Sequence, residues 1–155
     1  MAERHPDTHV TALDLPEVLA AFRSRAQGLG LAARIDTIAG DFHTAPIPPE
    51  QFDRVVVANV LHLESPERAA ALLRHLSPGV RPGGELVIVD SLGGDPEAER
   101  ARATYSLHLA LRTAGGYPHA RADLERWLRE AGLEPDRVSP LDDPQESALV
   151  GRLRC

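Results

Sequence analysis

The sequence contains no lysine and only one cysteine. All 17 positive residues are arginines, and the lone Cys155 supports neither a disulfide framework nor a cysteine metal cluster. The formal net charge of −6 argues against general nucleic-acid binding, which needs a basic surface. No apolar run approaches the roughly 20 residues of a membrane span. Because residues 1–9 are polar and unlike a secretory signal, a soluble cytoplasmic protein is expected.

Several short motifs of catalysis and binding are missing as well. The sequence has no HExxH or C-x₂-C metal spacing, no G-x-S-x-G elbow, no P-loop and no G-x-G-x-x-G. No metal site is therefore expected. The 155 residues, 43% of them hydrophobic and 26% charged, have the size and apolar content of one globular domain.

Stretches typical of strands and of helices alternate along the chain. Strands are predicted at 9–14, 34–39, 52–61 and 85–90, the last after a turn at Pro82-Gly83-Gly84. Residues 1–6 are predicted to be the frayed end of a helix. Further helices are predicted from Pro16 to Gly28 or Gly30, from Ser65 through Leu76, and at 96–111 and 121–131. The tail 138–153 is expected to form an antiparallel hairpin at the sheet edge. This alternation favours an α/β fold with right-handed crossovers.

Polar and aromatic side chains stand where the predicted strands stop. They are Asp14, Asp41 with Phe42, His62 and Asp90. Sheets of this class bind ligands beyond the carboxyl ends of their strands, so these side chains are candidate site residues.

Among these candidates, the first two acids, Asp14 and Asp41, can bind a nucleoside. Asp14 can accept hydrogen bonds from both ribose hydroxyls, or it can cap the helix that begins near Pro16. Asp41 can accept a hydrogen bond from an adenine amino group while Phe42 stacks on the ring. Alternatively, this segment is an ordinary Gly-Asp turn beside a buried phenylalanine. The residues alone leave both alternatives open.

His62 directly follows the buried apolar run of the third predicted strand. An imidazole exchanges its proton near neutral pH, where a phenol is mostly protonated, so it can act as a general base toward such a hydroxyl. The alternative is a polar residue of a loop. Asp90 can orient a base or cap a turn, and His75 and His108, within predicted helices, are interpreted as structural.

Five segments in this order resemble the catalytic domain of caffeate-type and polyketide-type O-methyltransferases, class I enzymes that use S-adenosylmethionine. They are Val10 to Val18 (VTALDLPEV), Gly40-Asp41-Phe42, Asn59-Val60-Leu61-His62, Arg81 to Asp90 (RPGGELVIVD), and Gly115-Gly116 with Trp127 to Gly132. The similarity covers residues 9–151. It implies a Rossmann-like methyltransferase sheet, mostly parallel, with an antiparallel last strand.

The resemblance also implies roles for single residues. Asp14 and Leu15 would bind the ribose side of S-adenosylmethionine, and Asp41 and Phe42 its adenine. His62 would deprotonate the acceptor, a hydroxyl of a small aromatic or polyketide-like molecule, with no metal required. The full-length form is expected to be a homodimer.

The chain departs from the family pattern at three places. Leu63-Glu64 follows the histidine where the family usually has Asp-Trp, and Tyr117-Pro118-His119 stands where many members carry an acid. The family's first strand with its glycine-rich loop, and its N-terminal dimerisation domain, have no counterpart in residues 1–155. We therefore expect a partial methyltransferase catalytic domain, unstable or rearranged, that is inactive or impaired alone.

Two other functions remain open at this point. One is a non-catalytic, degenerate methyltransferase module that pairs with a partner chain. The other is an NAD-type dinucleotide-binding domain, which needs the same glycine loop and gives His62 no role.

Overall fold

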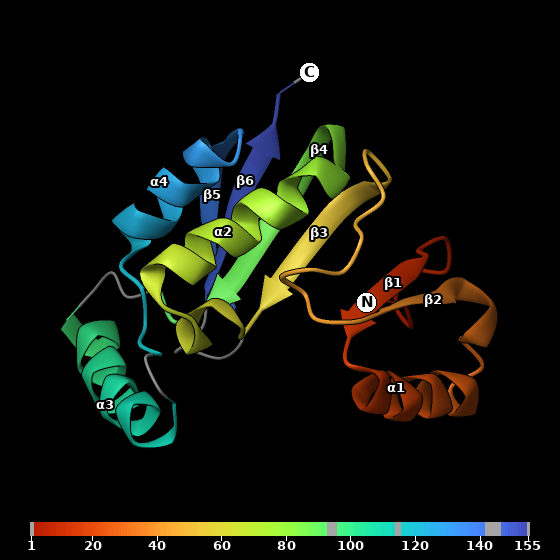
Figure 1. Ribbon diagram of the computed structural model, residues 1–155, viewed down its shortest axis with the longest axis horizontal. Coiled ribbons are helices and arrows are strands. Elements are labelled where there is room, and N and C mark those ends of the chain that lie inside the picture. Colours follow the sequence, from red (N-terminus) through yellow and green to blue (C-terminus); the bar gives the residue numbers. More distant parts are fainter. Residues whose placement is uncertain (1, 93–95, 114–115, 142–146, 155) are drawn as a thin grey trace. The chain divides into compact units, whose positions relative to one another are not determined.

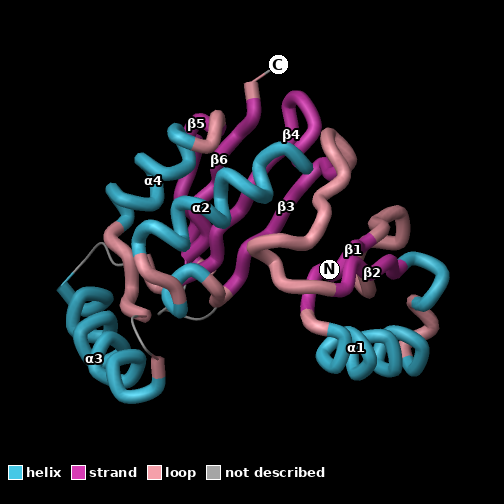
Figure 2. Tube along the Cα trace, viewed as in Figure 1, coloured by secondary structure: helices cyan, strands magenta, loops and turns pink. Residues whose placement is uncertain are grey.

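The computed structural model describes residues 2–92, 96–113, 116–141 and 147–154. The chain forms two compact units, Met1–Pro46 and Ile47–Cys155, and each has its own sheet. The first unit has the order strand, helix, strand, and the second begins with strand, helix, strand and continues with two helices and two strands (Figures 1 and 2), which confirms the predicted α/β class. No described helix is both long enough and apolar enough to cross a membrane.

The first unit is a βαβ element. Strand β1 (Val10–Asp14) pairs in parallel with β2 (Ile35–Ala39), and α1 (Pro16–Gly28) connects them. Pro16 occupies the first helical position of α1. Proline is favoured there because a backbone N–H at this position would have no partner within the helix. Leu19 of α1 is buried at 1% exposure.

Two predictions for the first unit are wrong in detail. Residue 34 belongs to a 3₁₀ turn, η1 (Ala32–Arg34), and not to the strand that follows. The described residues at the N-terminus form turns and no helix end. The reason lies in Arg34, whose two Nη1 hydrogens are shared among the carbonyl oxygens of Ala2, His5, Pro6 and Thr8, at N···O distances of 2.9 to 3.3 Å. Those oxygens are therefore bonded to the guanidinium.

The second unit contains a four-stranded sheet in the order β3-β4-β6-β5. Strands β3 (Phe52–Ala58) and β4 (Val80–Asp90) are parallel, while β5 (Leu133–Pro140) and β6 (Ser147–Leu153) form an antiparallel pair. The predicted hairpin pairing of the tail is confirmed. It begins earlier than predicted, at Leu133, and its second strand lies inside the sheet, antiparallel to β4.

Helices α2 (Pro66–Leu76) and α4 (Arg121–Glu130) cover one face of this sheet (Figure 1). Helix α2 begins as predicted, with the Ser65 hydroxyl accepting the Arg68 backbone N–H at 3.4 Å. Both helices have a stripe of buried apolar residues, and Leu86 and Ile88 of β4 are fully buried. Removing such side chains from water stabilises the fold by about 1.5–3 kcal/mol each. The third helix of the unit is α3 (Pro96–Arg112).

Two strand boundaries differ from the prediction. Strand β3 stops at Ala58, before the predicted end at residue 61, because Asn59 takes a left-handed conformation with a φ of 56°. Strand β4 starts at Val80 and includes the Pro82-Gly83-Gly84 segment that was predicted as a turn. A Cβ on Gly84 would lie 2.9 Å from the carbonyl oxygen of Asp53, so only glycine permits this close approach of β4 to β3.

Candidate active site

The parallel pairing of β3 and β4 brings their carboxyl ends together. Ala58, the last residue of β3, is opposite Val89, and the Asn59 N–H donates to the Val89 carbonyl at 2.9 Å. The left-handed Asn59 then turns the chain into a short 3₁₀ helix, η2 (Leu61–Leu63). This turn carries His62 to the end of β4, where Asp90 lies.

The carboxylate of Asp90 contacts His62 at two points. Its Oδ1 lies 2.8 Å from the ring Nδ1, and its Oδ2 accepts the His62 backbone N–H at 3.3 Å. The Ser91 N–H also donates to Oδ1, at 2.8 Å. Both side chains of the pair are only 6% exposed. His62 is therefore a buried residue of the turn between β3 and α2, and Asp90 both orients its imidazole and closes a turn.

This contact decides which ring nitrogen of His62 can accept a proton. A neutral imidazole has one N–H and one lone pair, and a carboxylate can only accept. Nδ1 therefore carries the hydrogen that faces Asp90, and Nε2 carries the lone pair. An imidazole held in this way can act as a general base through Nε2, with the carboxylate stabilising the imidazolium that forms.

Tyr105 of α3 is the side chain that meets Nε2. Its hydroxyl oxygen lies 2.9 Å from that nitrogen. The two rings meet edge to face, with centroids 5.2 Å apart. On its other side, the phenol ring is stacked on His108, at 6.2 Å and an interplanar angle of 12°. Sequence analysis assigned no role to Tyr105.

The segment that contains Gly116 and His119 packs against the η2 turn. His119 is 3% exposed, and its Nε2 donates to the Leu61 carbonyl at 2.9 Å. Burial lowers the pKa of His119, although the Leu61 carbonyl and the charge of Asp90 oppose this shift. A Cβ on Gly116 would lie 2.5 Å from the His62 carbonyl oxygen. In the sequence, Gly116 belonged to a segment that resembles the family, and His119 stood out only as part of a departure from its pattern.

In the first unit, Asp14 lies at the carboxyl end of β1. Its Oδ1 accepts the Leu15 backbone N–H at 2.8 Å. The helix cap position is occupied by Leu15, whose side chain makes no capping hydrogen bond. The capping alternative for Asp14 is therefore wrong. Leu15 itself is 46% exposed.

Asp41 and Phe42 follow β2 on the same edge of that small sheet, since the Gly40 N–H donates to the Asp14 carbonyl at 3.0 Å. The Asp41 Oδ1 accepts the His43 N–H at 2.7 Å, which makes this segment a Gly-Asp turn with an exposed aspartate. Phe42 is half-buried, so the alternative of a buried phenylalanine is wrong. The structure thus groups Asp14, Leu15, Asp41 and Phe42 in one unit, and His62 with Asp90 in the other.

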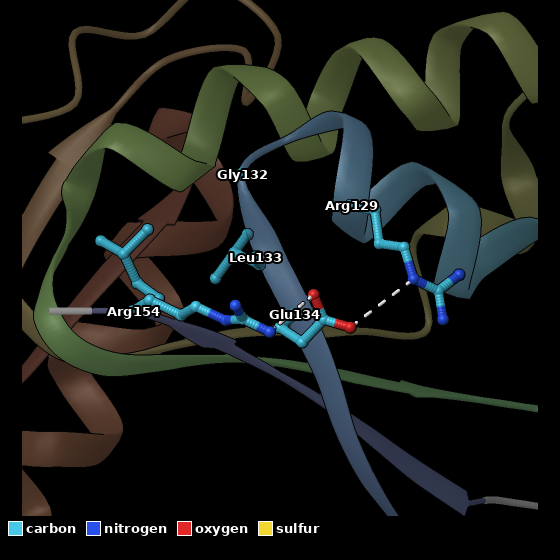
Figure 3. A pocket seen from close by; sticks show the side chains of 6 residues that line it. Arg129, Gly132, Leu133, Glu134 and Arg154 are labelled. Carbon is cyan, nitrogen blue, oxygen red and sulfur yellow. Dashed lines mark ion pairs between the residues drawn. The ribbon is translucent and has the colours of Figure 1, made fainter.

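A surface hollow lies at the opposite end of the large sheet (Figure 3). It is lined by Arg129, Gly132, Leu133, Glu134, Leu153 and Arg154. Arg152, beside the hollow on β6, pairs in register with Glu85 near the start of β4, whereas Asp90 ends that strand. Glu134 forms ion pairs with Arg129 at 3.8 Å and with Arg154 at 3.4 Å. The hollow is therefore separate from the His62 site, and its charges are paired.

Comparison with known proteins agrees with this arrangement. The family model described as the O-methyltransferase domain matches residues 1–134. The tetracenomycin polyketide synthesis 8-O-methyl transferase of Streptomyces glaucescens is 28% identical over 149 residues, which are 96% of this chain and 43% of that protein.

Two solved structures share the fold over nearly the whole chain. The S-adenosylmethionine-dependent methyltransferase SibL is 28% identical with a TM-score of 0.83, covering 99% of this chain and 46% of that one. An O-methyltransferase family 2 protein of Planctomyces limnophilus, in complex with apigenin, is 25% identical with a TM-score of 0.86, covering 97% and 45%. The chain thus spans less than half the length of these relatives. On the family match and these similarities, the chain belongs to the O-methyltransferase family.

Proposed function

We propose that this chain carries the acceptor-activating and adenosine-binding parts of an S-adenosylmethionine-dependent O-methyltransferase. Its acceptor is a hydroxyl group of a small aromatic or polyketide-like molecule. The observation that carries the proposal is the buried pair of Asp90 and His62, with Nδ1 and Oδ1 2.8 Å apart. The proposal agrees with two relatives, one named for tetracenomycin polyketide synthesis and one solved in complex with apigenin.

The proposed chemistry uses the protonation states that the geometry favours. His62 accepts the proton of the acceptor hydroxyl at Nε2, and Asp90 stabilises the resulting imidazolium. The acceptor oxygen then attacks the methyl group in line. S-adenosylmethionine supplies that methyl group on a sulfonium, which leaves as a neutral thioether. Beyond proton transfer, the protein positions the two reactants and excludes water, and no metal takes part.

The first unit offers groups that fit the adenosine part of S-adenosylmethionine. Asp14 accepts only one backbone N–H, from Leu15, among the contacts described, and a carboxylate has acceptor positions for both ribose hydroxyls. The exposed Asp41 can accept an adenine amino hydrogen. The half-buried Phe42 has ring surface for stacking, and the exposed Leu15 for apolar contact. We propose these four residues as the cofactor contacts.

The test is calorimetric titration with S-adenosylmethionine, followed by transfer of a labelled methyl group to simple phenols. Because the chain spans less than half of its relatives, both residues 1–155 and any longer product of the same reading frame are measured. We expect Asp14→Asn and Asp41→Asn to weaken binding at least tenfold, with Asp36→Asn, on the same small sheet, as the matched control. We expect His62→Gln to retain binding and lose methyl transfer.

The competing functions give different results in the same experiment. A non-catalytic module binds no S-adenosylmethionine in either form, and an NAD-type domain binds NAD(H) instead. Either result would overturn the proposal. The proposed homodimer of the longer form is measured separately by light scattering at several concentrations.

A further inference from the structure

The hydroxyl of Tyr105 occupies the place that a substrate hydroxyl would take on the base. Its oxygen is 2.9 Å from Nε2 of His62, the nitrogen that carries the lone pair. Since Nε2 has one lone pair, the phenol must be the donor in this contact. Tyr105 therefore makes with His62 the contact that the proposed reaction requires of a phenolic acceptor.

Exposure shows which of the two groups a substrate can reach. His62 is 4% exposed, whereas Tyr105 is only partly buried. A hydrogen-bonded series therefore runs from Asp90 through His62 to the phenolic oxygen of Tyr105, and Tyr105 is the most exposed residue of the three. A phenolic oxygen that donates its hydrogen still has lone pairs with which to accept another one.

Ring contacts on two sides hold Tyr105 in this position. The edge-to-face contact with His62 and the stacking on His108 are both of the kind that favours a fixed ring. Moving the phenol away would break both contacts and the hydrogen bond to Nε2. These contacts favour a tyrosine that stays in place while the acceptor binds, over one that moves aside.

We propose that Tyr105 is a catalytic residue that relays the acceptor's proton to His62. This inference rests on the proposed methyltransferase function. The acceptor hydroxyl gives its proton to the Tyr105 oxygen as the Tyr105 hydroxyl gives its own proton to Nε2. Tyrosine ends as a neutral phenol, His62 as an imidazolium paired with Asp90, and the acceptor as an oxyanion that takes the methyl group. His62 later releases the proton to water.

The test compares Tyr105→Phe with Tyr117→Phe, a change at the other tyrosine of the chain. Tyr117 is 41% exposed and its ring contacts His119. Two acceptors are used: an ordinary phenol, and a nitro-substituted phenol that is already ionised at the assay pH. The relay predicts that Tyr105→Phe slows transfer to the ordinary phenol by about 10²-fold or more, since general acid–base catalysis contributes about 10²–10⁴-fold.

The same relay predicts that the ionised phenol is methylated by Tyr105→Phe within about threefold of the unsubstituted rate, because no proton remains to be moved. Tyr117→Phe should leave both rates unchanged within that factor. Three results would overturn the relay. They are a full rate of Tyr105→Phe with the ordinary phenol, a faster rate that marks Tyr105 as a group that moves aside, and an equal loss with both acceptors.

A measurement without turnover separates this proposal from the proposed function. An unprotonated imidazole nitrogen that accepts a hydrogen bond resonates upfield of one that does not. We therefore expect the ¹⁵N resonance of His62 Nε2 to move downfield in Tyr105→Phe and to stay in place in Tyr117→Phe. An unmoved resonance excludes the relay even in an active enzyme. Absence of methyl transfer to any hydroxyl by the longer product of the same reading frame overturns the proposed function itself, and the catalytic relay with it.

Discussion

Asp90 binds both the ring and the backbone of His62, with its Oδ1 2.8 Å from Nδ1 and its Oδ2 3.3 Å from the backbone nitrogen. One carboxylate thus sets the tautomer of the imidazole, the orientation of its ring and the position of the turn that carries it. Three N–H groups face its oxygens: the ring Nδ1–H of His62, the backbone N–H of His62 and the backbone N–H of Ser91. Both oxygens must therefore accept, which only an ionised acid satisfies.

Asp90→Asn should therefore reduce methyl transfer to an ordinary phenol by about 10²–10⁴-fold. The amide has one accepting oxygen, so its NH₂ group must face an N–H of His62 or of Ser91. The charge that stabilises the imidazolium is also lost. Initial rates with a labelled methyl group measure the effect, and near-identical circular dichroism spectra serve as the control for folding. A variant that keeps the full rate would show that Asp90 has no part in the reaction.

Gly116→Ala should destabilise the second unit by about 1–3 kcal/mol, the usual cost of forcing extra atoms into a packed place. The new Cβ would lie 2.5 Å from the His62 carbonyl oxygen and 3.1 Å from the Leu63 Cα, so the η2 turn must shift. Gly28→Ala is the matched control, because no atom lies within 4 Å of a Cβ there and Gly28 is helical. Unfolding in denaturant measures both. Equal stabilities of the two variants would contradict the packing argument.

The unfolding free energy should fall in acid because of His119. Burial lowers the pKa of His119 in the folded protein. The unfolded chain therefore takes up this proton first, as the pH falls below about 6.5, and stability that is fully present above that pH is lost. His119→Gln removes the titration while keeping a donor for the Leu61 carbonyl.

Denaturant unfolding at pH 7.5 and pH 5.5 tests this prediction. The difference between the two stabilities should be smaller in His119→Gln than in the unsubstituted protein. His5→Gln, at an exposed position in the first unit, should leave the difference unchanged. An identical pH dependence in all three proteins would show that His119 does not titrate differently on folding.

Glu85→Gln should destabilise the large sheet by about 1–2 kcal/mol, since hydrogen bonds to a charged group are lost and a buried acceptor is weakened. The carboxylate, 11% exposed, receives Arg54 at 2.8 Å, Arg152 at 2.8 Å and Arg137 at 3.3 Å, one from each of the other three strands. These arginines are about half exposed, which limits the effect by solvent screening.

The stability contributed by Glu85 and its three arginines also depends on pH. Here the charged partners lower the pKa, whereas burial lowers that of His119. Burial raises the pKa of Glu85, but the hydrogen bonds and charges of Arg54 and Arg137 outweigh it and leave the pKa below its usual value. The stabilisation is present above the pKa of the unfolded glutamate and is lost as the pH falls through the folded value. Thermal unfolding at neutral pH measures the variant. Glu130→Gln, whose ion pairs are 3.7 and 3.8 Å long and exposed, should change stability by less than about 0.5 kcal/mol.

The sequence alone predicted the α/β class, the order of the elements and the family, because each depends on local patterns. Alternating apolar periods show strands and helices, and Ser65-Pro66 identifies the start of α2. Strand limits were less accurate. Pro82-Gly83-Gly84 has the composition of a turn, yet β4 runs through it as a bulge without partners on β3, between the pairs Val80 with Phe52 and Glu85 with Arg54. Asn59 ends β3 by its backbone conformation.

For the candidate site, the sequence by itself determined which polar side chains stand at or shortly after the strand ends: Asp14, Asp41, His62 and Asp90. Only the tertiary structure decided their partners. His62 meets Asp90 across 28 residues and Tyr105 across 43, and His119 reaches Leu61 across 58. Such contacts depend on the parallel register of β3 and β4 and on where α3 packs. Hydrogen-bond geometry between distant segments has no local pattern in the sequence, so Tyr105 and His119 became visible only in the folded chain.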